Sequence, residues 1–126
     1  MAKLPALLSE AWENRKGALV LTTVSSTGIP NSIYATCVSK YDEETLIVAD
    51  NYFNKTKENI LSGSDKGVIL FITEDDKAYQ IKGTLTYHVS GDIFDDMKKW
   101  NPAKHPGHAA VALKVEEVYK GAEKII

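Results

Sequence analysis

Three side chains that could bind an anion, Lys55, Thr56 and Lys57, occur together where an apolar run gives way to a helical pattern. The apolar run, Leu46–Ala49, has the composition of a strand, and the helical pattern reaches Leu61. The first backbone N–H groups of a helix have no internal partners and lie at the positive end of its dipole. Ammonium and hydroxyl groups at such a helix start favour a phosphate. The sequence therefore predicts a phosphate-binding site here, with an ordinary solvated helix start as the alternative.

The other chemically active residue types do not form a recognisable second site. His105 and His108 lie in a proline–glycine loop without neighbouring carboxylates or cysteines, so no metal site is predicted. Cys37 is the only cysteine, and its place in a strand pattern predicts a small buried side chain. No pairing of a nucleophile with a base is visible, so no catalytic residue is assigned.

Composition restricts the function classes. The 126 residues carry a net charge of −2, which argues against general nucleic-acid binding because that requires a basic face. No apolar run approaches the ~18 residues of a membrane span, and the first residues lack the pattern of a signal peptide. We therefore expect a cytoplasmic protein without nucleic-acid or membrane partners. Arg15 is the only arginine, so a phosphate elsewhere must be bound by lysine and backbone N–H groups.

Hydrophobic periodicity predicts a mainly β domain over residues 1–126, a small antiparallel barrel of six strands with two or three short helices. The helices are expected at Pro5–Lys16, Lys55–Leu61 and Ile93–Trp100. The first three strands should form a meander because short turns join them. Gly83 falls inside the fifth strand and predicts a bulge or a close backbone approach. The expected strands are Ala18–Val24, Ile29–Lys40, Thr45–Ala49, Val68–Thr73, Ala78–Val89 and Ala109–Val118.

Three phrases, in this order and spacing, resemble the pyridoxamine 5′-phosphate oxidase-like FMN-binding split barrels. The first, Gly28–Ala35, resembles the family's turn and second strand, in which a G-x-P motif precedes residues that lie along the flavin. The second, Asn54–Leu61, is similar to the family's K-T-x-N-L helix start. The third, Ala78–Leu85, resembles the long strand with its mid-strand glycine. The resemblance extends from the first helix to the last strand.

The resemblance implies a six-stranded split barrel that forms a homodimer, with FMN in a groove at the dimer interface. A flat apolar ring requires burial on both faces, which a second subunit would supply. Lys55 and Thr56, helped by Ser32 or its neighbours, would bind the FMN phosphate. The other implied cofactor-binding residues are Ile33, Tyr34, Ala35 and Thr36 along the ring and ribityl chain, Ala49, Asp50 and Asn51 at the ring nitrogens and carbonyls, and Gln80, Trp100, Asn101 and Pro102 from the opposing subunit.

Two departures from the family pattern bear on function. Members that oxidise pyridoxamine phosphate are longer and carry arginine and histidine in a C-terminal segment, whereas no arginine follows Arg15 here. We therefore do not expect oxidation of pyridoxamine phosphate itself. The arginine that family members usually place at the FMN phosphate is also missing, which predicts weaker FMN binding or a related flavin-like ligand.

The sequence is compatible with functions of three different classes. The leading hypothesis is an FMN-dependent oxidoreductase or electron carrier with a small-molecule or protein redox partner. The alternative is a non-catalytic binding module that holds a flavin, haem or other planar ligand on the same barrel. His105 or His108 would then be a candidate axial ligand of haem. A homodimer whose cofactor groove has decayed is a third alternative.

Overall fold

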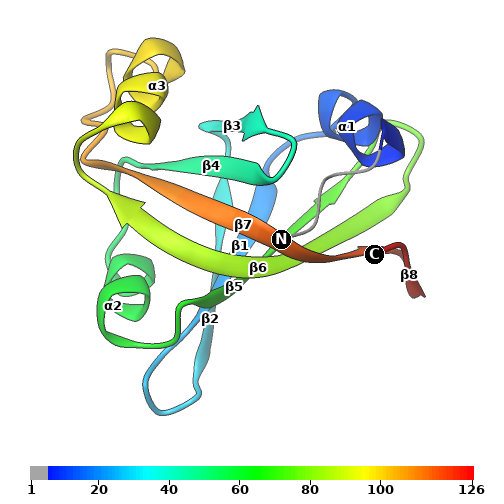
Figure 1. The fold of residues 1–126 in the computed structure, drawn as a ribbon, viewed down its shortest axis with the longest axis horizontal. Coiled ribbons are helices and arrows are strands. Elements are labelled where there is room, and N and C mark those ends of the chain that lie inside the picture. Colours follow the sequence, from blue (N-terminus) through cyan, green and yellow to red (C-terminus); the bar gives the residue numbers. More distant parts are fainter. Residues whose placement is uncertain (1–5) are drawn as a thin grey trace.

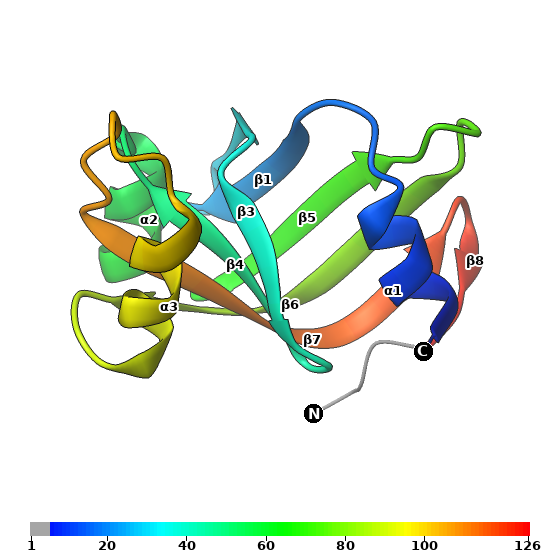
Figure 2. The same ribbon diagram turned by 90° about the horizontal axis from the view of Figure 1, so that it is seen from above.

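The computed structural model describes residues 6–126, and within that range it contains three helices and eight strands. Their bounds are α1 Ala6–Glu13, β1 Leu19–Val24, β2 Pro30–Ala35, β3 Val38–Asp42, β4 Thr45–Asp50, α2 Lys55–Ser62, β5 Lys66–Ile72, β6 Ala78–His88, α3 Asp92–Trp100, β7 Ala109–Lys120 and β8 Glu123–Lys124. The strands form one antiparallel sheet in the order β2-β1-β5-β6-β7-β4-β3, and the short β8 pairs with β7. This sheet curls into an incomplete barrel (Figure 1, Figure 2).

The predicted second strand is in fact two strands. β2 pairs with β1, whereas β3 pairs with β4. Both pairings that the predicted meander requires are therefore present, but β2 and β3 lie at opposite ends of the sheet order, so the middle strand of the meander is split in two. One straight strand cannot pair with neighbours at both ends of a curled sheet, so the strand breaks at Thr36 and Cys37. The predicted fold class is confirmed, with seven main strands in place of six.

The long strands β6 and β7 form the middle of the sheet. Ile81 and Leu85 of β6 point into the core, as their alternation predicts. The predicted irregularity at Gly83 is confirmed, because the register between β6 and β7 shifts between Lys82 and Gly83. A Cβ atom at Gly83 would lie 2.0 Å from the carbonyl oxygen of Lys114. Only glycine therefore fits at this position of β6, where the backbone of β7 comes closest.

The first helix is shorter than the sequence predicts. α1 ends at Glu13 because the next residues pair with the end of β5: Arg15 forms an isolated bridge with Thr73, and the Lys16 N–H donates to the Ile72 carbonyl. Pro5, the predicted first residue, lies outside the described residues. The predicted helices at 55–61 and 93–100 are confirmed within one residue at each end. No helix in the range 6–126 is long and apolar enough to cross a membrane.

The helices cover different faces of the sheet. Trp12 of α1 and Ile60 of α2 are buried in the main core, inside the curl of the sheet, and the two helices lie at opposite ends of it (Figure 1, Figure 2). Met97 of α3 instead packs with Ile47 and Ala49 in a second cluster on the outer side of β4. β4 is therefore buried on both faces, which explains its continuous apolar sequence.

The outer face of β2, β1 and β5 is left uncovered by the three helices of the described range. Val20 of β1 lies between Tyr34 of β2 and Leu70 of β5 in the strand register. The side chain of Tyr34 is 80% exposed, and Leu70 and Ile72 of β5 are also exposed. Apolar stripes of this kind are typical of surfaces that bind another molecule.

Candidate functional site

A cavity of about 460 Å³, the main cavity, lies between β2 and the segment that joins β4 to α2. β2 is not hydrogen-bonded to β4, because the two strands belong to opposite ends of the sheet order. His105, from the loop after α3, also lines the cavity. The remaining lining residues are Asn31, Ile33, Tyr34, Ala35, Thr36 and Cys37 on one wall, and Ala49, Asn51, Tyr52, Phe53, Asn54, Lys55 and Thr56 on the other.

One end of the main cavity carries the residues predicted to bind phosphate. Thr56 is buried, and its hydroxyl oxygen accepts a 3.2 Å hydrogen bond from Asn31 Nδ2. Lys55 Nζ forms a 2.5 Å ion pair with Glu58 Oε2, and Lys57 lies in the same first turn of α2. The positive end of a helix dipole normally disfavours cations. An anionic ligand would stabilise a cation placed there, so Lys55, which lines the main cavity, favours the binding of one.

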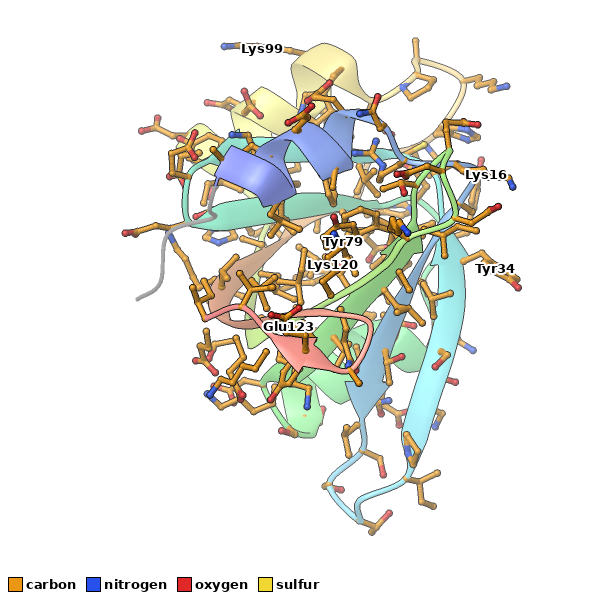
Figure 3. All side chains as sticks on the ribbon, turned by 90° about the vertical axis from the view of Figure 1, so that its right-hand side faces the viewer. Lys16, Tyr34, Tyr79, Lys99, Lys120 and Glu123 are labelled. Carbon is orange, nitrogen blue, oxygen red and sulfur yellow. The ribbon has the colours of Figure 1, made fainter. Side chains whose placement is uncertain are left out.

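The side chains of β2 alternate between the cavity side and the outer face. Ile33 is half-buried and packs against the main core. Tyr34 points away from β2 into solvent (Figure 3). Ser32 also lies on the outer face, where its hydroxyl shares a 2.8 Å hydrogen bond with Thr22. Near the predicted phosphate position, Asn31 therefore lines the cavity and Ser32 does not.

Asp50, the last residue of β4, is 1% exposed and does not line the main cavity. Its Oδ1 accepts a 2.9 Å hydrogen bond from the Phe53 N–H, and its Oδ2 accepts a 2.5 Å bond from the Tyr87 hydroxyl. Burial, together with this carboxylate, raises the pKa of Tyr87, so the phenol keeps its proton. The Asp50 carbonyl also accepts from the His108 N–H. Asp50 thus joins the turn after β4, strand β6 and the loop before β7.

A reciprocal pair of amides fixes the cavity wall next to Asp50. Asn51 Nδ2 donates to Asn101 Oδ1 at 3.0 Å, and Asn101 Nδ2 donates to Asn51 Oδ1 at 2.9 Å. The Gly107 N–H donates to the same Asn51 oxygen at 2.9 Å. Asn51 lines the main cavity, whereas Asn101 supports it from behind. This network connects loops that are 50 residues apart in the sequence.

Tyr52 and His105 come together in the main cavity, although the sequence does not place them in one site. The Tyr52 hydroxyl and His105 Nδ1 are 3.1 Å apart, and the two rings meet edge to face with centroids 5.5 Å apart. His108 is exposed and lies outside the cavity lining. Across residues 6–126, no three His, Cys, Asp or Glu side chains gather as a metal site would require.

The remaining predicted residues lie away from the main cavity. Gln80 is on the outer face of β6, between Leu70 and Tyr119 in the register. Trp100 and Pro102 line a second cavity of about 390 Å³. This second cavity adjoins the main cavity, and the residues common to both linings are Thr36, Cys37 and His105.

Comparison with known sequences gives a family match over almost the whole chain. The model of the family described as pyridoxamine 5′-phosphate oxidase matches residues 8–121. An uncharacterised protein of Methanocaldococcus jannaschii is 29% identical over 124 residues, which cover 94% of this chain and 81% of that protein.

Solved structures with the same fold share little sequence with this chain. HupZ of Group A Streptococcus superposes with a TM-score of 0.80 at 22% identity, covering 93% of each chain. An FMN-binding protein of Syntrophomonas wolfei gives a TM-score of 0.76 at 21% identity, covering 90% of this chain and 85% of that one. HutZ of Vibrio cholerae, described as a heme storage protein, gives a TM-score of 0.67 at 16% identity, covering 95% of this chain and 96% of that one. At these identities the likeness establishes the fold alone.

Proposed function

The chain belongs to the pyridoxamine 5′-phosphate oxidase-like family of FMN-binding split barrels, and on that premise we propose that it is an FMN-binding flavoprotein. One observation carries the proposal: a single cavity joins an anion-favouring helix start to a strand that can lie along a planar ring. An elongated ligand with a phosphate at one end fits this arrangement. The Syntrophomonas wolfei protein, which has the same fold, is an FMN-binding protein, and this likeness supports the proposal.

The residues of the main cavity suit the parts of FMN. Lys55, the Thr56 hydroxyl and Asn31 would hold the phosphate, in the absence of an arginine. The backbone from Ile33 to Thr36 would lie along the ring and ribityl chain, with Asn51 on the opposite wall. When bound, the flavin supplies hydride or electron transfer, and the protein supplies binding and orientation. The protein would therefore act as an oxidoreductase or an electron carrier.

A second copy of the chain would complete the site. The proposed interface is the uncovered outer face of β2, β1 and β5, with Tyr34, Val20 and Leu70 in register. This face is continuous with the main cavity, because Tyr34 belongs to both. A second copy would bring Gln80, which pairs with Leu70 in the strand register, toward the exposed side of the cofactor. Sedimentation of the purified protein as a dimer supports this part of the proposal, and a monomer at micromolar concentration contradicts it.

FMN uptake tests the central proposal. The purified protein should be yellow, and cofactor-free protein should bind added FMN with quenching of flavin fluorescence. Lys55→Ala should weaken FMN binding at least about tenfold, because one hydrogen bond to a charged group contributes ~1.5–3 kcal/mol. Lys57→Ala is the matched control, since Lys57 lies in the same turn but does not line the main cavity. Colourless protein that takes up no FMN, or equal losses in both variants, would contradict the proposal.

A second candidate function is storage or sensing of haem on the same barrel. It is favoured by His105, which lines the main cavity, and by the fold likeness to HutZ, described as a heme storage protein. Imidazole is a common axial ligand of haem iron. Titration with haem distinguishes the two functions: a Soret shift that is lost in His105→Ala supports haem binding. Reduction of bound flavin by nicotinamide cofactors supports the redox function instead.

A further inference from the structure

The second cavity begins where the proposed flavin site ends. Of these two cavities, Lys55 and Thr56 line only the main one, whereas Thr36, Cys37 and His105 line both. A ligand with its phosphate at Lys55 that extends along β2 would reach the link between β2 and β3. The second cavity opens at this link and is large enough, at about 390 Å³, for a small molecule of its own.

The lining of the second cavity is positively charged. Lys104 lines it, and no aspartate or glutamate does so within the described part of the chain. None of the ion pairs found among residues 6–126 involves Lys104. An ammonium group without an acidic partner at the edge of a hollow attracts an anionic ligand.

Apolar groups share the rest of the lining of the second cavity with the hydroxyl groups of Thr36 and Ser39. Trp100 is half-buried, and its indole N–H donates a 3.1 Å hydrogen bond to Asp96 Oδ2. Because that donor already has a partner, the indole offers a ligand apolar ring surface. Cys37 and Pro102 add further apolar surface. An aromatic or similarly flat body suits such walls.

His105 stands at the boundary between the two cavities. Its Nδ1 is paired with the Tyr52 hydroxyl at 3.1 Å, which fixes the ring. No other hydrogen bond of this imidazole occurs among residues 6–126, so Nε2 is available as a donor or an acceptor. The boundary therefore offers one polar group beside the charge of Lys104.

We infer that the second cavity binds a small aromatic carboxylic acid beside the cofactor. Lys104 supplies the counter-charge, Trp100 the apolar wall and His105 a hydrogen bond. The inference rests on the proposed flavoprotein function, for which such an acid would be a substrate or redox partner. A single lysine without arginine suits a carboxylate with one negative charge better than a second phosphate.

Titration of the FMN-loaded protein with sodium benzoate tests the inference. Benzoate should change the flavin absorbance saturably and quench tryptophan fluorescence, because Trp100 lines the second cavity whereas Trp12 is buried in the main core. Benzamide, the neutral molecule of the same shape, should bind at least threefold more weakly. Lys104→Gln should weaken benzoate binding about two- to fivefold, the range expected for one partly solvated charge pair. Lys99→Gln, on α3 and outside both linings, should leave it unchanged.

Four outcomes test this inference and distinguish its failure from failure of the proposed function. FMN uptake without any benzoate response overturns the inference and leaves the flavoprotein proposal standing. Equal binding of benzoate and benzamide, or equal effects of the two lysine variants, also overturns it. Quenching of Trp100 fluorescence by benzoate in protein that takes up no FMN supports the acid site and overturns the flavoprotein proposal.

Discussion

The two sides of this barrel are held together in different ways. On the side of β5, β6 and β7, backbone ladders join the strands, and the β6–β7 ladder runs from Tyr79 to His88 with one register shift at Gly83. On the split side, around the main cavity, single side chains form the connections: Asn31 joins β2 to Thr56 of α2, Asp50 joins the end of β4 to Tyr87 of β6, and Asn51 joins the turn after β4 to Asn101. Ladders leave no space for a ligand, whereas isolated side-chain bridges leave a cavity between them. We infer that the ladder side sets stability and the split side sets binding.

The largest expected effect tests the ladder side. Gly83→Ala should lower the free energy of unfolding by about 3–5 kcal/mol, because the new Cβ would clash with the Lys114 carbonyl at 2.0 Å. Urea unfolding measures this loss. Gly121→Ala is the control, because a Cβ atom at that position would meet only open space. Its positive φ of 58° alone disfavours alanine and should lower the free energy of unfolding by about 1 kcal/mol. The FMN affinity of the folded Gly83→Ala protein should stay unchanged. Equal losses of unfolding free energy in the two variants would contradict this prediction, because they would show that β6 and β7 can move apart at little energetic cost.

A moderate effect is expected at the bridge from Asp50 to β6. Tyr87→Phe removes a hydrogen bond to a buried carboxylate and should cost about 2 kcal/mol of unfolding free energy at pH 7. It should also weaken FMN binding several-fold, because Asp50 positions the turn that lines the main cavity. Thr86→Ala, beside it on the outer face of β6, should leave FMN binding unchanged. Unchanged FMN affinity in Tyr87→Phe would contradict the assignment of binding to the split side.

The same bridge has a predictable pH dependence. Folding raises the pKa of Tyr87 above its ordinary value of 10.0, so the folded protein holds this proton more tightly than the unfolded chain does. The stability contributed by Tyr87 is therefore complete below pH 10 and is lost as the pH rises above 10. The difference in unfolding free energy between the natural protein and Tyr87→Phe should shrink in that range. A constant difference from pH 7 to pH 11 would contradict the link.

The smallest expected effect is a gain of binding. Glu58→Gln should strengthen FMN binding about two- to threefold, because Lys55 Nζ would no longer be held by the carboxylate 2.5 Å away. Glu116→Gln is the matched control, since Glu116 pairs with Lys66 on the ladder side, outside the main cavity. Isothermal titration resolves a change of this size. Weaker binding in Glu58→Gln would indicate that Glu58 orients Lys55 toward the ligand.

The ladder side was accessible to sequence reasoning because its signals are local. Alternation along β6 and a glycine inside that strand predicted both the buried face and the irregularity at Gly83. The helix start at Lys55 was likewise visible, since charge and periodicity change within a few residues.

The split side was less accessible, because its determinants are distant in the sequence. No glycine or proline marks the break between β2 and β3 at Thr36–Cys37, where the chain crosses from one end of the sheet to the other. The inward direction of Asp50 depends on Tyr87, 37 residues later. The meeting of Tyr52 with His105 depends on a loop 53 residues away. Only the folded sheet brings these groups together.

The position of β7 in the sheet has a consequence for how the chain acquires its structure during synthesis. β7 lies between β4 and β6, both of which precede it in the sequence. The ribosome must therefore release residues 109–120 before β7 can join β4 to β6. Until then, β4 and β6 each expose an unpaired strand edge. Such long-range pairing slows folding. The nascent chain is consequently most exposed to aggregation, and most dependent on chaperones, just before its last long strand emerges.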